Sequence, residues 1–217
     1  MAGPLSGIKL VEFAGIGPGP FCGMILADLG AEVIRIDRSS QHGRGNTIDF
    51  QHRSKLSLSA DLKNPQTINE IKKLLLSVDG LIEGFRPDVM ERLGLSFETL
   101  QKINPKLVYG AIRGFGDPRS GGSPYMDWPS YDVVAQAMGG VISLTGESPK
   151  QVSKVGPGVG DIFSGLFLCF GVIAALRDAE ATGKGQFVDI SMYDAMISLC
   201  ERAVYQYDIE GKIPTAG

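Results

Sequence analysis

The chain has 217 residues, enough for one large domain or two small ones with a real core. Hydrophobic residues make up 43%, charged residues 21%, and the net charge of −3 is spread along the chain in mixed signs, as in ordinary soluble proteins. No basic stripe indicates a nucleic-acid partner. The three cysteines lie far apart, so neither a disulfide framework nor a metal-ligand spacing is visible, which favours a reducing, cytoplasmic compartment.

Short apolar strands alternate with helices along the chain. In order, we predict a strand at 8–13, a helix at 21–29, strands at 32–36 and 56–60, a helix from 65 to about 77 and a strand at 80–85. A short helix starts near Pro87, and strands at 107–111 and 186–190 flank a loop at 117–129 and a helix at 132–138. A last helix covers 193–207. This alternation predicts an α/β fold with an open, mostly parallel sheet and flanking helices.

The longest uncharged run, residues 162–176, predicts a buried core helix. It is too short for a confident membrane span and contains Ser164 among its glycines, so we expect no membrane partner.

Asp161 directly precedes that run and follows a glycine-rich segment, VGPGVG at 155–160. Glycines let a ligand approach the backbone, and a helix N-terminus stabilises a carboxylate. The pattern is typical of an ionised nucleophile or base at the mouth of a pocket. A plain helix N-cap is the alternative interpretation, and this segment alone leaves both open.

The turn after the first strand, GIGPGP at 15–20, partly matches a dinucleotide fingerprint, with Asp37 as the acid after the second strand. Pro20 replaces the third glycine, so NAD binding is disfavoured, although the turn still suits a nucleotide or pantetheine. Basic residues near predicted strand ends are candidate phosphate ligands, with solvated surface charge as the alternative. They are Arg35, Arg38, Lys55, Arg86 and Arg92.

Other reactive side chains favour plainer interpretations. His42 and His52 lie in a polar loop and are expected to be surface residues. Cys22 is expected to be a packed thiol. Asp132 offers a second acid close to a predicted helix start, with capping as the alternative.

Taken in order, several segments resemble the class III (formyl-CoA transferase, CaiB/BaiF) CoA-transferase family, which also contains α-methylacyl-CoA racemase. They are LSGIKLVEF (5–13), GPGPF (17–21), LADLGAEVI (26–34), SLSADLK (57–63), FRPDVMERLG (85–94), GVGDIFSG (158–165) and TGKGQ (182–186). The resemblance implies a Rossmann-like fold, no tightly bound cofactor and no metal, and a CoA thioester as substrate. It also implies a small carboxylic acid as second substrate and a homodimer, interlocked at full length.

The resemblance assigns roles to individual residues. Asp161 matches the aspartate that attacks the acyl-CoA thioester, and Asp132 is a supporting acid. Tyr131 stands where the racemase branch has a histidine, which favours a transferase because a tyrosine is a poor partner for α-proton exchange. Gly17 stands where oxalate-linked formyl-CoA transferases have a glutamine, which argues against oxalate and formate. The implied CoA contacts are Ile16, Gly17, Arg38, Phe85 and Arg92.

Family members are nearly twice as long, so we expect the N-terminal part of such a protein: a CoA-binding domain at 1–190 and a linker helix at 191–217. Two alternatives stay open. One is a 2-methylacyl-CoA racemase or epimerase, and the other is a CoA-binding fragment that cannot turn over.

Overall fold

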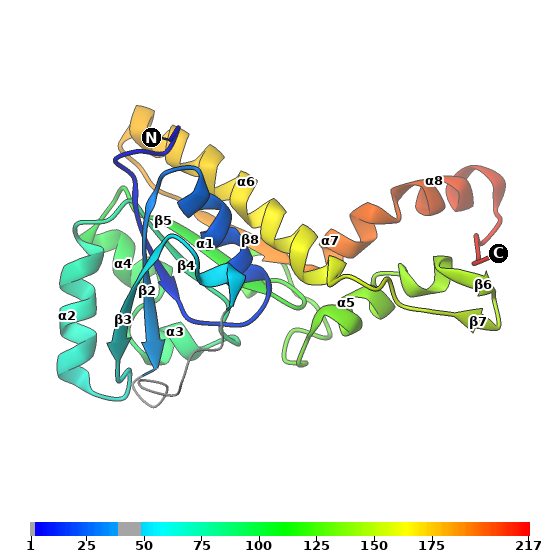
Figure 1. Ribbon diagram of the computed structural model, residues 1–217, viewed down its shortest axis with the longest axis horizontal. Helices are drawn as coiled ribbons and strands as arrows, with labels where there is room; N and C mark the ends of the chain where they lie inside the picture. Colours follow the sequence, from blue (N-terminus) through cyan, green and yellow to red (C-terminus); the bar gives the residue numbers. More distant parts are fainter. Residues whose placement is uncertain (1–2, 39–48) are drawn as a thin grey trace.

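A six-stranded parallel sheet forms the centre of the protein, shown in Figure 1 as a computed structural model that describes residues 3–38 and 49–217. The strand order is β3-β2-β1-β4-β5-β8. The bounds are β1 (Lys9–Phe13), β2 (Glu32–Arg38), β3 (Lys55–Ala60), β4 (Gly80–Glu83), β5 (Val108–Arg113) and β8 (Phe187–Ser191). The predicted α/β fold with an open parallel sheet is therefore confirmed.

The strand order reverses between β1 and β4. From β1 the chain builds outward through β2 and β3 on one side, and β4, β5 and β8 extend the sheet on the other. This is the order of a Rossmann-type sheet, in which ligands bind beyond the carboxyl ends of the strands at the reversal. The fold thus points to the residues that follow β1 and β4.

Helices cover both faces of the sheet (Figure 1). One layer consists of α1 (Pro18–Asp28), α6 (Val159–Thr182) and α7 (Met192–Leu199), and its core includes Leu10, Ile82 and Leu168. The other consists of α2 (Pro65–Leu75), α3 (Val89–Arg92) and α4 (Phe97–Ile103), over Val11 and Leu81. Neighbouring residues of one strand serve opposite cores because successive side chains point to opposite faces.

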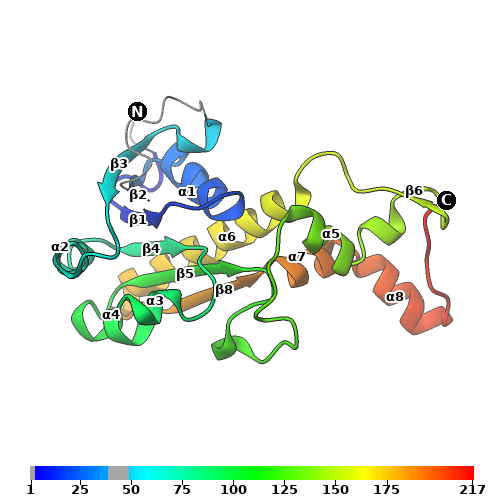
Figure 2. The same cartoon turned by 90° about the horizontal axis from the view of Figure 1, so that it is seen from below.

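The remaining elements extend from one end of the sheet (Figure 2). They are α5 (Asp132–Met138), the 3₁₀ turn Ile142–Leu144, the short hairpin β6 (Gly146–Ser148) and β7 (Gln151–Val152), and α8 (Glu201–Glu210). Two further 3₁₀ turns, Phe50–His52 before β3 and Pro118–Ser120 after β5, lie beside the sheet and its helices. None of the residues of α8 is buried. This end of the chain therefore carries much apolar surface that the described residues do not cover.

The structure differs from the sequence predictions at several helices. α1 begins at Pro18, three residues early, and α4 was not predicted. The helix predicted at 193–207 is two helices, because Cys200 leaves helical geometry (φ −94°, ψ 16°). Its N–H donates to the carbonyl of Ile197, three residues back, where a continuous α-helix would use the carbonyl of Met196.

The helix predicted as a buried core helix at 162–176 also has an exposed face, with Phe170 66% accessible. Within the described ranges, this helix, α6, is the single one long and apolar enough to cross a membrane by length and composition. Its buried face packs against α1, β5 and α7. The expectation of no membrane partner stays a prediction.

Candidate active site

A cleft of about 920 Å³ opens beyond the carboxyl ends of the strands, where the strand order reverses. It is lined by the turn after β1, the ends of β2 and β3, the loop after β4 and the segment before α5. The lining includes Phe13, Ile16, Pro18, Arg35, Asp37, Arg38, His52, Ser57, Ser59, Phe85, Arg86, Trp128, Tyr131, Asp161 and Met192. Distant parts of the sequence therefore meet at one site.

Asp161 lies in the first turn of α6, half-buried at the wall of this cleft. The N-cap of α6 is Gly158, and no side chain caps the helix. The alternative interpretation of Asp161 as the N-cap is therefore wrong. Among the described residues, no donor forms a hydrogen bond with its carboxylate, which leaves both oxygens available to a ligand.

Burial, followed by the negative charge of Asp132, raises the pKa of Asp161 to about 6. Asp132 begins α5, where its Oδ1 accepts the Gly160 N–H at 2.8 Å and its Oδ2 accepts Gln136 Nε2 at 2.8 Å. Gln136 in turn accepts the Val155 N–H at 2.9 Å. Asp132 thus ties the start of α5 to the start of α6. Asp161 remains mostly ionised at neutral pH but is poorly solvated, as suits a nucleophile.

Gly17 lies directly against Asp161. A methyl group placed on Gly17 would lie 2.5 Å from Asp161 Oδ2, and the backbone of Gly17 (φ 77°, ψ −115°) is one that only glycine adopts readily. The turn before α1 therefore presents bare backbone to the carboxylate. This close approach explains the glycine at this position without reference to a dinucleotide.

Exposed apolar side chains surround the approach to Asp161. Ile16 is 89% accessible, Tyr131 66% and Trp128 56%, although all three line the cleft. Trp128 packs edge-on against Tyr125, with ring centroids 4.9 Å apart. Large exposed apolar groups in a cleft are typical of a surface that a ligand or a further part of the protein covers.

The cleft also has polar and charged lining residues. Arg35 and Ser57 both donate hydrogen bonds to Asp37. Burial alone would raise the pKa of Asp37, but these hydrogen bonds outweigh it and lower that pKa. Arg38 and Arg86 also line the cleft. His52, expected on the surface, lines it too, 3.3 Å from Asp49, and burial followed by the charge of Arg35 lowers its pKa.

The structure brings most of the predicted site residues together. Ile16, Arg38, Phe85, Tyr131 and Asp161 line the cleft, while Gly17 and Asp132 adjoin Asp161. Arg92 is not among the lining residues, and its Nε donates to the Asp88 carbonyl at 3.2 Å. Its contact with CoA stays a prediction.

Two further residues of the sequence analysis lie close together near the start of α1. Lys55 is not a phosphate ligand, because its ammonium is buried and bonded to Glu12 Oε2 at 2.6 Å and to the Pro20 carbonyl at 2.8 Å. Cys22 is a packed thiol, as expected. His42 lies outside the described residues.

Comparisons with known proteins place this sequence and fold in one family. The profile of CoA-transferase family III matches residues 5–217. A succinyl-CoA:mesaconate CoA-transferase from Haloarcula hispanica is 39% identical over 98% of this chain and 58% of its own. A formyl-CoA:oxalate CoA-transferase from Escherichia coli is 37% identical over 92% of this chain and 50% of its own.

Among solved structures, a CaiB/BaiF family protein from Brucella suis superposes with a TM-score of 0.90 at 34% identity, covering 100% of this chain and 60% of that one. The chain thus spans a little over half the length of the relatives that it matches. With a family profile along nearly its whole length and a matching fold, the chain belongs to CoA-transferase family III.

Proposed function

We propose that this chain carries the nucleophile and the CoA-binding cleft of a CoA-transferase, which moves CoA from an acyl-CoA thioester to a carboxylic acid. The observation that carries the proposal is the position of the Asp161 carboxylate in the cleft. This carboxylate, with a pKa raised to about 6, lines the same cleft as the guanidinium-bearing residues Arg38 and Arg86. Guanidinium groups suit the phosphates of CoA, and the carboxylate suits attack on a thioester.

The proposed reaction divides a difficult exchange into easier steps. The Asp161 carboxylate attacks the thioester carbonyl, the C–S bond breaks, and an acyl-aspartyl anhydride and CoA thiolate form. The thiolate then attacks the aspartyl carbonyl, giving an aspartyl-CoA thioester and releasing the donor acid. The acceptor carboxylate repeats these two steps in reverse, and Asp161 is regenerated. Backbone N–H groups of the glycine-rich turn around Gly17 would stabilise the oxyanions, whereas the Gly160 N–H already donates to Asp132.

Asp132 is proposed as the supporting acid that keeps Asp161 reactive. Its charge helps to raise the pKa of Asp161, and its hydrogen bond to the Gly160 N–H fixes the first turn of α6. Tyr131 favours transfer over racemisation, because a phenol does not exchange an α-proton readily at neutral pH.

The relatives suggest which substrates to test first. One is named for succinyl-CoA and mesaconate and another for formyl-CoA and oxalate. A glutamine in place of Gly17 would have no room beside Asp161, since even a methyl group there would lie 2.5 Å from its Oδ2. We therefore propose succinyl-CoA as the first donor and a small carboxylic acid other than oxalate as the acceptor.

We further propose a cytoplasmic homodimer. The buried free thiols Cys22, Cys169 and Cys200 suit a reducing compartment, and the exposed apolar side chains of α6 and α8 suit a second copy of the chain.

The test is the intact mass of the purified chain after incubation with succinyl-CoA and other acyl-CoA thioesters, followed by hydroxylamine. We expect a hydroxylamine-labile adduct at Asp161 that Asp161→Asn abolishes. Asp194→Asn is the matched control, because Asp194 occupies the same third position of a helix, in α7, outside the cleft. It should form the adduct at the wild-type level.

Other outcomes separate the alternatives. CoA binding with no adduct, together with solvent deuterium at the substrate α-carbon, would establish a racemase. Binding with neither adduct nor exchange would indicate a chain that binds CoA but lacks part of its catalytic unit.

A further inference from the structure

Phe85, which lines the cleft just after β4, is held at both of its backbone polar groups by one buried ion pair. Its N–H donates to Glu83 Oε2 at 2.7 Å, and its carbonyl accepts Arg113 Nε at 3.2 Å. Arg113 also donates from its Nη2 to Glu83 Oε1 at 2.7 Å. The three residues therefore close a ring of hydrogen bonds around the start of the loop.

Glu83 has no solvent exposure, and the Arg113 side chain is 5% exposed. Taking such a pair out of water is unfavourable, and apolar residues of similar volume often give equal or better stability. The pair is thus poorly explained as a source of stability alone. What an apolar replacement would lack is the two directed hydrogen bonds to Phe85.

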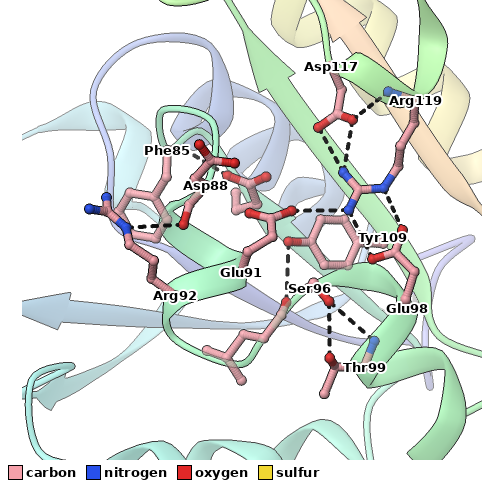
Figure 3. A network of polar contacts seen from close by, with 12 residues as sticks. Phe85, Asp88, Glu91, Arg92, Ser96, Glu98, Thr99, Tyr109, Asp117 and Arg119 are labelled. Carbon is pink, nitrogen blue, oxygen red and sulfur yellow. Dashed lines mark hydrogen bonds and ion pairs between the residues drawn. The ribbon is translucent and has the colours of Figure 1, made fainter.

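The same network continues outward to α3. Arg113 donates to Asp117 at 2.5 Å, and Figure 3 shows Arg119 held between Asp117, Glu98 and Glu91. Glu91 is the neighbour of Arg92 on α3. The loop between β4 and α3 is consequently braced at its beginning by Glu83 and at its far end by Arg119.

The backbone between these anchors does not take a relaxed path. Asp88 has a positive φ of 65°, in the left-handed region that non-glycine residues seldom occupy. Such a conformation persists where the surroundings determine it. The hydrogen bonds on either side of Asp88 thus hold this loop in the shape in which Phe85 lines the cleft.

We propose that Glu83 is a positioning residue for CoA binding, acting with Arg113 through the backbone of Phe85 without touching the ligand. This inference rests on the proposed function, because it takes CoA as the occupant of the cleft. Loss of the ring of hydrogen bonds should weaken CoA binding about ten-fold, the effect of about 1.4 kcal/mol.

A pH dependence should accompany this role. Several groups face Glu83: Arg113 and Tyr109 on β5, Glu91 on α3, and Asp117. Burial raises the pKa of Glu83 to about 7, although the charge of Arg113 opposes it. Below that pH the Glu83 carboxyl is protonated, so it no longer accepts hydrogen bonds from the Phe85 N–H and from Arg113 as an anion. The affinity advantage of the wild type over Glu83→Gln should be full at pH 8 and small at pH 6.

The chain contains a single tryptophan, Trp128, and it lines the cleft, so its fluorescence reports CoA binding directly. The experiment is a CoA titration of the wild type, Glu83→Gln, Phe85→Ala and the double variant, each at pH 6 and pH 8. At pH 8 we expect Glu83→Gln to raise Kd about ten-fold in the wild type but less than about two-fold in the Phe85→Ala background.

Tyr109→Phe is the control for a merely structural effect. The Tyr109 hydroxyl donates to the Leu95 carbonyl in the same core, with no bond to Phe85. Its removal should lower the unfolding temperature while leaving the Kd for CoA unchanged. Three results would each overturn the inference. Tyr109→Phe could lose as much CoA affinity as Glu83→Gln, or Glu83→Gln could raise Kd by the same factor in the wild type and in Phe85→Ala. The third is a Kd that Glu83→Gln leaves unchanged. If the wild type shows no saturable CoA signal, the proposed function itself fails, and the positioning role fails with it.

Discussion

Asp161 makes the folded protein less stable in the state in which it is proposed to react. Its pKa is raised from 3.8 to about 6, so between these values the folded state binds more protons than the unfolded state. The contribution of this group to stability therefore falls as pH rises from about 4 through about 6. We predict that Asp161→Asn is more stable than the wild type at pH 7.5 by about 1–2 kcal/mol, a value reduced for the partial exposure of the carboxylate.

The measurement is thermal unfolding of both proteins at pH 4.5 and pH 7.5. The gain should shrink at pH 4.5, because the folded wild type then carries a mostly protonated, uncharged Asp161. A gain of the same size at both pH values would contradict the assignment. Asp194→Asn should give no such gain.

Gly17 offers a second test on the scale of one residue. Gly17→Ala brings a methyl group to 2.5 Å from Asp161 Oδ2 and also strains the backbone. Gly7 has a similar positive φ of 94°, but a methyl group there meets nothing within 4 Å. Gly7→Ala should therefore lose about 1–2 kcal/mol from backbone strain alone, and Gly17→Ala about 1–3 kcal/mol more from the clash.

Urea unfolding measures this difference, and the mass adduct at Asp161 provides an independent check. Gly7→Ala should form the adduct, and Gly17→Ala should not, because the displaced carboxylate no longer faces the thioester. Equal stability of the two variants would show that the turn before α1 gives way easily.

A buried ion pair anchors the start of α1. Lys55 begins β3, and its ammonium joins Glu12 of β1 to the Pro20 carbonyl in the first turn of α1. Glu12 is fully buried, its Oε1 has no partner among the described residues, and burial raises its pKa despite the charge of Lys55. We predict that Lys55→Met costs about 3–5 kcal/mol, because it strands a buried carboxylate.

The double variant Lys55→Met with Glu12→Leu should recover most of that loss in urea unfolding, since no buried charge then remains unpaired. If the double variant is as unstable as the single one, the Pro20 carbonyl contact, and not the ion pair, stabilises α1.

The sequence predicted the six strands of the central sheet well, but it missed the β6–β7 hairpin and placed the helix ends less well. Strands such as β5 are apolar runs bounded by clear turn residues, Asn104 and Pro105 before it and Gly114 after it. α4 was missed although Ser96 caps it and Glu98 follows in its first turn, a pattern typical of a helix start. The break at Cys200 has no such marker, because it depends on the packing of α7 against α5 and α6.

The site was predictable where its residues lie in glycine-rich motifs. Asp161 and Gly17 stand in such segments, and the order of the strands brings them together. Glu83, Arg113 and His52 carried no local signal, since their roles arise from contacts between residues distant in sequence. Contacts of that kind follow from the fold and cannot be inferred from residue spacing.

The uncovered apolar end of the molecule yields a last prediction. None of the residues of α8 is buried, and three of its large apolar side chains, Tyr205, Tyr207 and Ile209, are each more than half exposed. Surfaces of this kind are rare on monomers, so we predict that the chain sediments as a dimer at micromolar concentration. Replacing Tyr205 and Ile209 together by serine should give a monomer while changing the free energy of unfolding per protomer by less than about 0.5 kcal/mol.

Leu76→Ser is the matched control, because Leu76 is 53% exposed at the end of α2, far from α8 along the sheet (Figure 1). It should leave the sedimenting species unchanged. A monomeric wild type would contradict the proposed homodimer, and a dimer that survives the α8 substitutions would place its contacts on another surface, such as the exposed Phe170 face of α6. Sedimentation velocity of the three proteins at one concentration therefore decides both whether the chain associates and which helix does so.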